Sequence, residues 1–281
     1  MSDHKSNLTE LNAEEWAAVL ANPDVASKKY GVTLPRLPSA GAQIATAGAA
    51  GMRTILEASE FYHAVKDEFE RLGKKISTAN VLDFGCGWGR ITRTFLKDVP
   101  ASNIQGIDVR PDIISLAKSL TTDIAFDVTS PAPPTKFSAE TFDLIVAYSV
   151  FSHLPENIAN EWIDEFARIL KPGGLLVFTT RSRKHLVISS SLRNHQDPAF
   201  SSSAYAHMFE DFKPAIDAYD RGEFVYAPTG GGKGLPSETY GEAIIPEAYI
   251  KKHWTKKFDL LNFIESYSDK VGQPLIFLRK K

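Results

Sequence analysis

The sequence predicts an α/β fold built on a mostly parallel sheet, and three observations support this fold. From Ala79 onward, short apolar runs of strand length alternate with segments of helical periodicity. Such alternation indicates parallel strands joined by right-handed crossovers. Two strand-like runs then close the chain around a short turn, as in an antiparallel hairpin. A hydrophobic content of 43% in 281 residues is sufficient for a sizeable buried core.

The first 75 residues are predicted to form a helical N-terminal arm or cap, with breaks. Residues 9–22 open on a polar cap. Residues 52–73 carry apolar side chains at helical spacing and end on a glycine, Gly73, that is a natural helix stop. Between them, residues 31–51 are rich in Pro, Gly and Ala, so we expect an irregular segment.

The predicted core spans residues 76–181. Its strand-like runs are NVLDFG, IQGIDV, DIAFDV, FDLIVAYS and GLLVFTT, and the helical segments include ITRTFLKDV and IANEWIDEFARIL. Residues 182–250 lose the alternation and gain Ser, Gly, Pro and aromatic residues, which indicates an insertion or lid that binds the acceptor. Residues 251–281 contain FDLLNFIESYS and QPLIFLRK, which bring the predicted sheet to seven strands.

The composition excludes several classes of partner. The formal net charge is −2 with both signs interspersed, so no broad positive field is available for nucleic acid or an anionic membrane. No stretch approaches the roughly 18 apolar residues of a membrane span, and a cytoplasmic protein is expected. Cys86 is the single cysteine, which excludes an internal disulfide and a cysteine-clustered metal site.

The stretch VLDFGCGWGR joins a predicted strand to the next segment through Gly85, Gly87 and Gly89. A glycine turn after a strand presents bare backbone amides at the carboxyl edge of the sheet, where ligands of open α/β folds bind. The spacing is G-x-G-x-G, and Arg90 occupies the position of the third glycine of a dinucleotide fingerprint. The spacing therefore argues against a bound pyrophosphate.

Two acidic residues end neighbouring predicted strands. Asp83 lies two residues before Gly85, and a carboxylate there repels a diphosphate but suits a ligand with positive charge. Asp108 ends the next strand, 23 residues after Gly85, where a carboxylate can accept both hydroxyls of a ribose. The pair favours a nucleoside that carries a cationic group.

These motifs resemble the class I S-adenosylmethionine-dependent methyltransferases, in particular bacterial members of uncharacterised acceptor, some of which occur in polysaccharide-modifying contexts. DFGCGWG matches their glycine loop, IDVRPDII their second acidic strand end, and FDLIVAYSVFSHLPE and ILKPGGLLVF their fourth and fifth strand motifs. The resemblance covers about residues 79–180, with the closing hairpin in the expected place. It implies a Rossmann-like, doubly wound sheet, S-adenosyl-L-methionine as methyl donor, S-adenosyl-L-homocysteine as product, and no metal.

The resemblance also assigns residues to the methionine half of the cofactor. Asp83 would hold the methionine amino group, and the backbone of Gly85, Cys86 and Gly87 would pack against the methionyl and ribose groups. Tyr148, after the fourth strand, would lie beside the methionine moiety.

Other residues are assigned to the nucleoside and the carboxylate. Asp108, with Val109 beside it, would take the ribose, and Asp127 the adenine amino group. Val128 would pack on the adenine ring. Arg53 would meet the methionine carboxylate from the N-terminal segment, as a charge-assisted pair.

Each of these residues has a structural alternative. Asp83 and Asp108 are also suited to capping a helix, and Asp127 to a solvated loop. Cys86 fills the turn as a small residue, without sign of a reactive thiolate. Arg90 is expected to pair with a nearby acid at a helix start.

Methyl transfer from a sulfonium is an in-line displacement, so holding the acceptor in position supplies most of the acceleration. An alcohol acceptor must lose a proton, and His153 is the candidate catalytic base, with capping of the helix that starts near Pro155 as the alternative. Arg181 follows the fifth strand and either holds an acidic group or is solvated. The insertion contributes further candidates for acceptor binding, with surface or packing roles as alternatives: Tyr205, His207, Tyr240, Glu242, His185 and His195.

The glycine cluster at residues 229–234, TGGGKG, does not match a P-loop. Gly234 replaces the Ser or Thr that would follow Lys233, and no strand precedes it, so a lid loop is expected.

The sequence favours a methyltransferase of a small molecule or glycan, with oxygen as the acceptor atom and the acceptor bound between the sheet edge and a cap made by the N-terminal arm and the insertion. An N-methyltransferase, a non-catalytic binding protein for the same cofactor and a nicotinamide-dependent oxidoreductase remain alternatives. Acceptor identity and oligomeric state are left open, because irregular segments have no spacing to interpret.

Overall fold

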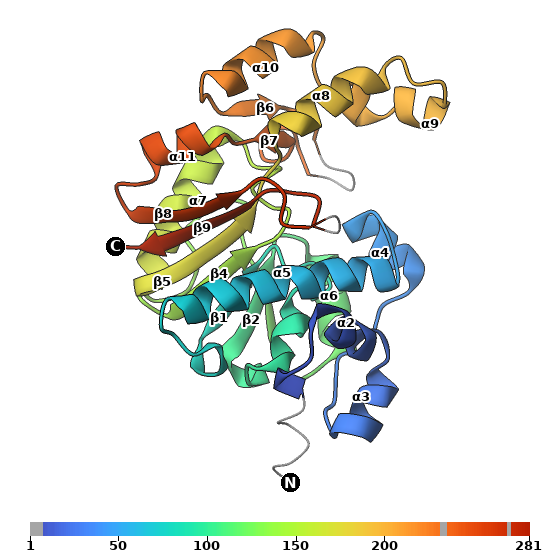
Figure 1. The fold of residues 1–281 in the computed structure, drawn as a ribbon, viewed down its shortest axis with the longest axis vertical. Coiled ribbons are helices and arrows are strands. Elements are labelled where there is room, and N and C mark those ends of the chain that lie inside the picture. Colours follow the sequence, from blue (N-terminus) through green and yellow to red (C-terminus); the bar gives the residue numbers. More distant parts are fainter. Residues whose placement is uncertain (1–7, 231–234, 269–270) are drawn as a thin grey trace. The chain divides into compact units, whose positions relative to one another are not determined.

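The computed structural model describes residues 8–230, 235–268 and 271–281. Within these residues, one sheet has seven strands in the order β3-β2-β1-β4-β5-β9-β8, and a second sheet consists of β6 and β7 (Figure 1). β1 is parallel to β2 and β4, and β2 is parallel to β3. β9 is antiparallel to both β5 and β8. This topology confirms the predicted seven-stranded, mostly parallel sheet with an antiparallel strand.

The chain forms two compact units, each made of three segments. The first consists of residues 1–130, 141–148 and 268–271, and the second of residues 131–140, 149–267 and 272–281. The division into four segments that the sequence suggests, with limits at residues 75, 181 and 250, stays a prediction.

The first unit holds the parallel strands, and their bounds match the predicted runs: β1 (Val81–Phe84), β2 (Ile104–Asp108), β3 (Ala125–Val128) and β4 (Phe142–Ala147). β1 is paired on both sides, with Asp83 opposite Gly106 of β2 and Val146 of β4. Since parallel strands end at the same edge of a sheet, the residues that follow β1, β2 and β4 gather at one edge.

Two predicted N-terminal helices are present. They are α2 (Ala13–Ala21), with a capping box between Asn12 and Glu15, and α5 (Met52–Arg71). α5 buries a stripe that includes Ile55, Tyr62 and Phe69, and Gly73 follows its end at a φ of 77°. α2 packs against α5, and the two helices lie side by side (Figure 1).

The segment 31–51 was expected to be irregular, and this expectation is wrong for part of it. α3 (Pro23–Tyr30) precedes the segment, and α4 (Ala40–Ala47) lies within it. The Ser39 hydroxyl accepts the Ala42 amide, and Gln43 is buried with its side chain bonded to Pro38 and Gly51. These caps and the high helix propensity of alanine outweigh the Pro and Gly content.

The segment after the glycine turn, residues 91–99, was expected to be an α-helix. It forms instead a 3₁₀ helix, Thr92–Lys97, whose side chains are buried except that of Leu96. Thr92 donates to Asp83 of β1 and Arg93 to the Gly89 carbonyl of the loop, which favours a tighter turn than an α-helix. The remaining elements of the first unit are α6 (Pro111–Leu120) and two short 3₁₀ helices, Ile76–Thr78 and Ala101–Asn103.

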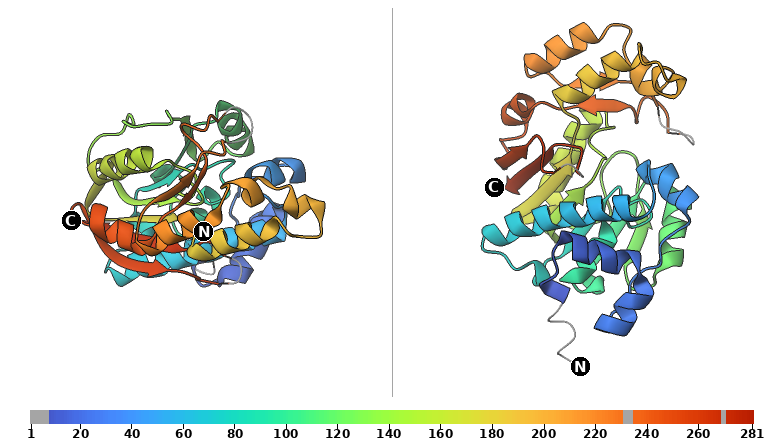
Figure 2. Two further views of the ribbon diagram at one scale, coloured as in Figure 1. Left: turned by 90° about the horizontal axis from the view of Figure 1, so that it is seen from above. Right: turned by 45° about the vertical axis from the view of Figure 1, so that its right-hand side comes forward.

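The second unit contains the antiparallel part of the large sheet. Its elements are α7 (Glu156–Ile169), β5 (Leu170–Thr179), α11 (Glu247–His253), β8 (Phe258–Ile264) and β9 (Leu275–Lys280). Figure 2 shows β9 beside β5 and β8, so the predicted antiparallel hairpin is confirmed. β5 begins directly after α7, and the KPGG motif is therefore part of the strand and not a separate turn.

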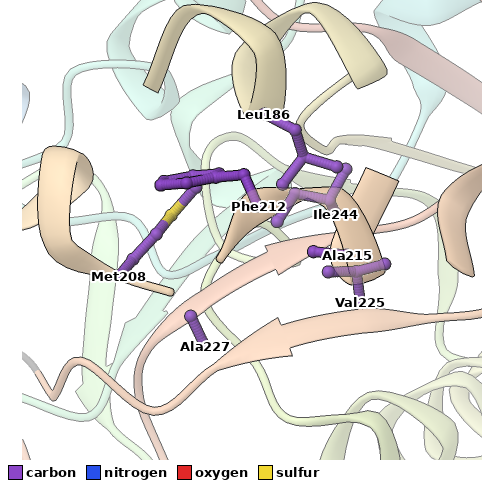
Figure 3. Close-up of a cluster of buried hydrophobic side chains, with 7 residues drawn as sticks. All are labelled: Leu186, Met208, Phe212, Ala215, Val225, Ala227 and Ile244. Atoms are coloured by element: carbon purple, nitrogen blue, oxygen red, sulfur yellow. The ribbon is translucent and has the colours of Figure 1, made fainter. Parts of the chain in front are cut away.

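The insertion is more regular than the sequence suggests. It contains α8 (Arg183–Leu192), α9 (Pro198–Ser201), a 3₁₀ turn (Ala204–His207), α10 (Phe212–Asp220), β6 (Val225–Ala227) and β7 (Glu242–Ile244). These elements enclose a small core of their own, to which Leu186, Phe212 and Ile244 contribute (Figure 3). No periodicity in residues 182–250 is long enough to predict this core. The TGGGKG cluster and the SDKVG turn lie partly outside the described residues, at 231–234 and 269–270.

Gly106 of β2 is a test of the packing behind the glycine turn. A Cβ at this position would lie 2.7 Å from two atoms of the Phe126 ring and 2.9 Å from the Cys86 sulfur. We expect Gly106→Ala to lower the free energy of unfolding by about 1–3 kcal/mol, because a well-packed core has no space for the methyl group. Denaturant unfolding measures this change.

Gly41→Ala is the matched control. A Cβ at Gly41, inside α4, would meet no atom within 4 Å. Alanine is the better helix former by about 1 kcal/mol, so this variant should be as stable as the wild type or more stable. A Gly106→Ala variant of wild-type stability would contradict the packing described here.

Candidate active site

The turn after β1 has an unusual backbone. Gly85, Gly87 and Gly89 all have positive φ angles, of 71°, 54° and 84°. The Gly85 and Cys86 amides donate to the carbonyl of Ile107 in β2, at 2.8 and 3.0 Å. A Cβ on Gly87 would meet no atom within 4 Å, so this side of the loop is open. The loop therefore needs glycine for its conformation and leaves backbone accessible to a ligand.

Asp83 lies beneath this loop and is almost completely buried. Its carboxylate accepts the Thr92 hydroxyl at 2.5 Å. Burial raises the pKa of Asp83 to about 7, although bonds from Thr92 and the charge of Arg90 act in the opposite direction. Near neutral pH, the protonated and ionised forms of Asp83 are therefore both populated, and a cationic ligand group would favour the ionised form.

Asp108 connects the loop to the end of β2. One carboxylate oxygen accepts the Gly87 amide at 2.9 Å, and the other accepts the Arg110 amide at 3.0 Å. Burial raises its pKa, against the effect of these two amides. Each oxygen keeps a second lone pair, so the carboxylate can still accept hydroxyl groups of a ligand.

The remaining nucleoside candidates lie at the ends of β2 and β3. Asp127 accepts the Gln105 side-chain amide at 3.3 Å, and Lys118 lies 4.0 Å away. Val128 is 49% exposed, an unusual exposure for a strand residue of this size. Val109 is half-buried beside Asp108. Cys86 is buried, and burial raises the pKa of its thiol, in agreement with a packing role.

A cluster of Glu57, Arg90 and Tyr148 lies in the same unit. Arg90 Nη1 donates to Glu57 Oε2 at 2.9 Å and to the Thr54 carbonyl at 3.1 Å. The Tyr148 hydroxyl donates to Glu57 Oε1 at 2.7 Å, and the guanidinium lies 4.8 Å from the centre of the Tyr148 ring. The expected pairing of Arg90 with an acid is confirmed, with an acid from α5. Arg53, in the first turn of α5, is exposed.

A second polar cluster belongs to the second unit and centres on His153. Its Nδ1 lies 2.8 Å from the Gly241 carbonyl and 3.4 Å from Glu242 Oε1. The ring stacks on Tyr240, with 4.5 Å between the ring centres. α7 has Pro155 at its N-cap and no side-chain cap, so His153 does not cap that helix. Because a carbonyl only accepts, Nδ1 carries a proton, and the neutral ring has its lone pair on Nε2.

Arg181 and Glu242 form a buried ion pair in this cluster, with Nε and Oε2 2.6 Å apart. Burial acts to raise the pKa of Glu242, but the bond from His153 and the charge of Arg181 outweigh it, and the pKa is lowered. Arg181 Nη2 also donates to the Tyr205 hydroxyl at 3.3 Å. The structure thus brings together four predicted acceptor residues with His153.

His185 belongs to the same cluster, and one of its ring nitrogens has no hydrogen-bond partner among the described residues. Its ring packs edge-on against Tyr205, with ring centres 5.3 Å apart. Its Nε2 is buried, and no hydrogen-bond partner is found for it among the described residues. Burial, helped by Arg181, lowers the pKa of His185 to about 4, so the ring is neutral near pH 7. His207 instead bonds to Ser201 at the surface, and His195 packs on Phe200.

Comparison of the sequence with known protein families identifies a domain in this part of the chain. Residues 81–174 match the model of a methyltransferase domain. This range starts with β1 and the glycine loop and includes Asp108, Asp127 and Tyr148. Residues 81–174 therefore carry a methyltransferase domain, as the glycine and acidic motifs predict.

Curated relatives match this chain over less than half of its length. A ubiquinone biosynthesis O-methyltransferase of Hydrogenovibrio crunogenus is 27% identical over 42% of this chain and 49% of its own length. A malonyl-[acyl-carrier protein] O-methyltransferase of Halalkalibacterium halodurans is 34% identical over 36% of this chain and 38% of its own length. The chain thus spans half or less of the length of these relatives.

Solved structures show the same fold at low identity. A methyltransferase from Clostridium acetobutylicum has a TM-score of 0.53 at 14% identity, and the match covers 79% of this chain and 92% of that one. A magnesium protoporphyrin IX methyltransferase from Synechocystis with bound S-adenosylhomocysteine has a TM-score of 0.51 at 14% identity, with 82% and 87% covered.

The described residues contain no group of three or more His, Cys, Asp or Glu side chains arranged to hold a metal ion. In the same ranges, no helix has the length and apolar character needed to cross a bilayer.

Sequence reasoning missed Glu57 of the first cluster and a separate polar network around Ser149. Glu57 is an acid within the amphipathic α5, a position that gives no motif signal. Ser149 has a φ of 58°, rare for a residue with a side chain, and donates its amide to Thr179 Oγ1 at 2.7 Å. Gln273 donates to the Ser149 hydroxyl at 2.9 Å. Both belong to a network that only the fold creates.

His185 predicts a dependence of stability on pH. Its pKa of about 4 in the folded chain lies below the ordinary value of 6.5, so the unfolded chain binds the proton more strongly. Stability from this group is complete above pH 6.5 and is lost as the pH falls toward 4. We expect the melting temperature of His185→Leu to fall less than that of the wild type over this range, as measured by calorimetry. Parallel curves for both proteins would contradict the buried, neutral ring.

Proposed function

We propose that this protein is an S-adenosylmethionine-dependent methyltransferase that transfers a methyl group to an oxygen atom of a small molecule or glycan. The observation that carries the proposal is the loop with three positive-φ glycines, held between the carboxylates of Asp83 and Asp108. This arrangement offers one buried acid for a cationic group and one hydrogen-bonded acid for a ribose. A diphosphate would meet two negative charges there.

The residues present fit this cofactor. Asp83 would hold the methionine ammonium and Asp108 the ribose hydroxyls. The backbone of Gly85, Cys86 and Gly87, which is open at Gly87, would contact the groups between them. When bound, S-adenosylmethionine supplies a methyl group on a sulfonium, ready for in-line displacement. We extend the assignment to the adenine side, where the exposed Val128 would pack on the ring and Asp127 would accept its amino group.

The cluster around His153 supports oxygen as the acceptor atom. An alcohol must lose its proton during the transfer, and an unprotonated imidazole nitrogen serves as the base. The Gly241 carbonyl at 2.8 Å and the Glu242 carboxylate at 3.4 Å hold the proton on Nδ1, which leaves Nε2 to receive the proton of the acceptor. Both curated relatives named above are O-methyltransferases, which adds support.

The other residues of the second cluster suit a polar, uncharged acceptor. Arg181 and Glu242 neutralise each other, and His185 is neutral. Tyr205 and Tyr240 add aromatic surface and hydroxyl groups, a combination that favours a hydroxylated ring such as a phenol or a sugar. We therefore keep a small molecule or glycan as the acceptor class. His207 stays a prediction, since its contact with Ser201 lies outside this cluster.

Ligand binding tests the cofactor directly. We expect the wild type to bind S-adenosylhomocysteine and not NAD in calorimetric titrations. Asp108→Asn should weaken S-adenosylhomocysteine about 10- to 100-fold, because hydrogen bonds to a charged group contribute about 1.5–3 kcal/mol each. Asp112→Asn is the matched control: this acid is 63% exposed and pairs with Arg110, so its affinity should match the wild type. Binding of NAD in place of S-adenosylhomocysteine would refute the proposal.

The pH dependence of binding tests the role of Asp83. Its proton leaves as the pH rises through about 7, and the ionised carboxylate attracts the ligand ammonium. The affinity for S-adenosylhomocysteine should therefore rise between about pH 5.5 and 7.5. Asp83→Asn should bind more weakly and show a flat profile over this range. The same rise in both proteins would assign the titration to another group.

A further inference from the structure

His185 carries a polar atom that the fold leaves without a partner. Within residues 8–230, 235–268 and 271–281, its ring nitrogen Nε2 is the one buried side-chain nitrogen or oxygen that has no hydrogen bond. A buried polar atom that has lost water and gained no partner costs free energy, and folded proteins rarely retain one. Its retention here indicates that a group from outside these residues completes it.

Contacts within the second unit link His185 to the proposed base. The His185 ring packs edge-on against Tyr205, and the Tyr205 hydroxyl accepts a hydrogen bond from Arg181 Nη2. Arg181 in turn pairs with Glu242 Oε2 at 2.6 Å, and Glu242 Oε1 lies 3.4 Å from His153 Nδ1. The two imidazoles therefore lie at the ends of one chain of side-chain contacts.

His185 is held firmly, whereas Tyr205 is free to move. α8 is anchored by Leu186, which is fully buried in the small core of the insertion (Figure 3), and the His185 amide donates to the Ser182 carbonyl at 3.0 Å. Tyr205 lies on a four-residue 3₁₀ turn and is 38% exposed, and its hydrogen bond with Arg181 is long, at 3.3 Å. Exposed side chains change rotamer rapidly. A Tyr205 ring that moves away from His185 would give a ligand access to Nε2.

The surroundings of Nε2 favour a neutral group that carries a hydroxyl. Arg181 and Glu242 neutralise each other, so neither is left to pair with a charged group of a ligand. A charged group in this cluster would therefore lack a counterion, which is costly in a buried site. A neutral imidazole nitrogen either donates or accepts, depending on the tautomer, and a hydroxyl group can do both. A hydroxyl thus satisfies Nε2 in either tautomer, whereas a carbonyl or an ether satisfies only one.

We propose that His185 is a specificity-determining residue, whose Nε2 binds a second hydroxyl group of the acceptor after the Tyr205 ring has moved aside. The acceptor then carries two hydroxyl groups: one loses its proton to His153, and the other is held at His185. This inference rests on the proposed function and deepens it, because it narrows the acceptor to dihydroxy compounds, either aromatic diols or sugars. Tyr205 covers His185 until the acceptor binds.

Matched pairs of probes test the second hydroxyl group. The protein is loaded with S-adenosylhomocysteine, and catechol is compared with phenol, and cis-1,2-cyclohexanediol with cyclohexanol, so that the pairs distinguish an aromatic from a sugar-like acceptor. We expect the wild type to bind the dihydroxy member of one pair about 10-fold more tightly than its monohydroxy partner, because the added hydrogen bond also satisfies a buried atom. In ¹⁵N NMR spectra of histidine-labelled protein, only the dihydroxy probe should shift the Nε2 resonance of His185.

Three variants assign the effect to His185. His185→Leu should reduce the preference to less than about twofold, yet its melting temperature at pH 7 should be no lower than that of the wild type, because the unsatisfied nitrogen is removed. A purely structural histidine would show the reverse. His185→Gln should keep part of the preference, since its amide group also forms hydrogen bonds. His195→Leu is the matched control: His195 is exposed and packs on Phe200 in the same insertion, so the preference should not change.

The outcomes separate this inference from the function on which it rests. Equal affinities within both pairs, no binding of any probe, or a preference that survives in His185→Leu would each overturn the role of His185. In these cases, binding of S-adenosylhomocysteine by the wild type would leave the proposed cofactor intact. A wild type that does not bind S-adenosylhomocysteine would refute the proposed function itself and the inference with it.

Discussion

The hydrogen bond between the Gly87 amide and Asp108 determines how the site is built. It joins the loop after β1 to the end of β2, and the Gly85 and Cys86 amides add two bonds to the Ile107 carbonyl. The loop reaches these partners only because three of its residues have positive φ, which glycine adopts without strain. Once the loop is held in this way, Asp83 lies buried beneath it and Arg90 leaves it toward α5.

Burial of charge gives the site its chemical character. Asp83 is surrounded by protein, its pKa lies near 7, and a cation from outside would complete its environment. Arg93 is also buried, and burial lowers its pKa to about 9. Unlike Asp83, it already has protein partners, because its N–H groups donate to the carbonyls of Gly89 in the loop and of Pro35 and Arg36 in the N-terminal segment. Arg93 thereby ties that segment to the loop. A buried cation bonded to carbonyls is structural, whereas a buried acid near its titration point is suited to binding.

The sequence predicted the parts of the molecule that short-range patterns control. Asp83 and Asp108 lie at the ends of strands of ordinary apolar composition, and the glycine spacing requires a turn after the first strand. Both strands and the loop could therefore be predicted from the sequence. The 3₁₀ helix at Thr92–Lys97 could not be predicted, because hydrogen bonds from Thr92 to Asp83 and from Arg93 to Pro35 override the helical periodicity. α4 was missed for a related reason, since its cap residue Ser39 and the buried Gln43 act in a segment whose Pro and Gly content indicated a loop.

The candidate sites follow the same division. His153, Arg181 and Glu242 were found by their places after strands or in the insertion, but the contacts that bring them together join residues 88 and 61 positions apart. Glu57 had no signal, because an acid in an amphipathic helix is ordinary on its own, and only its partner Arg90 makes it notable. His185 was one of several candidate histidines, and the structure distinguishes it by a buried nitrogen that has no hydrogen-bond partner among the described residues.

A crystal structure of the complex with S-adenosylhomocysteine is the most direct measurement of the proposed cofactor site. The ligand should lie along the open side of the glycine loop, with its ribose hydroxyls on Asp108 and its ammonium facing Asp83. A nucleoside bound away from Asp108, or an ammonium that does not contact Asp83, would contradict it.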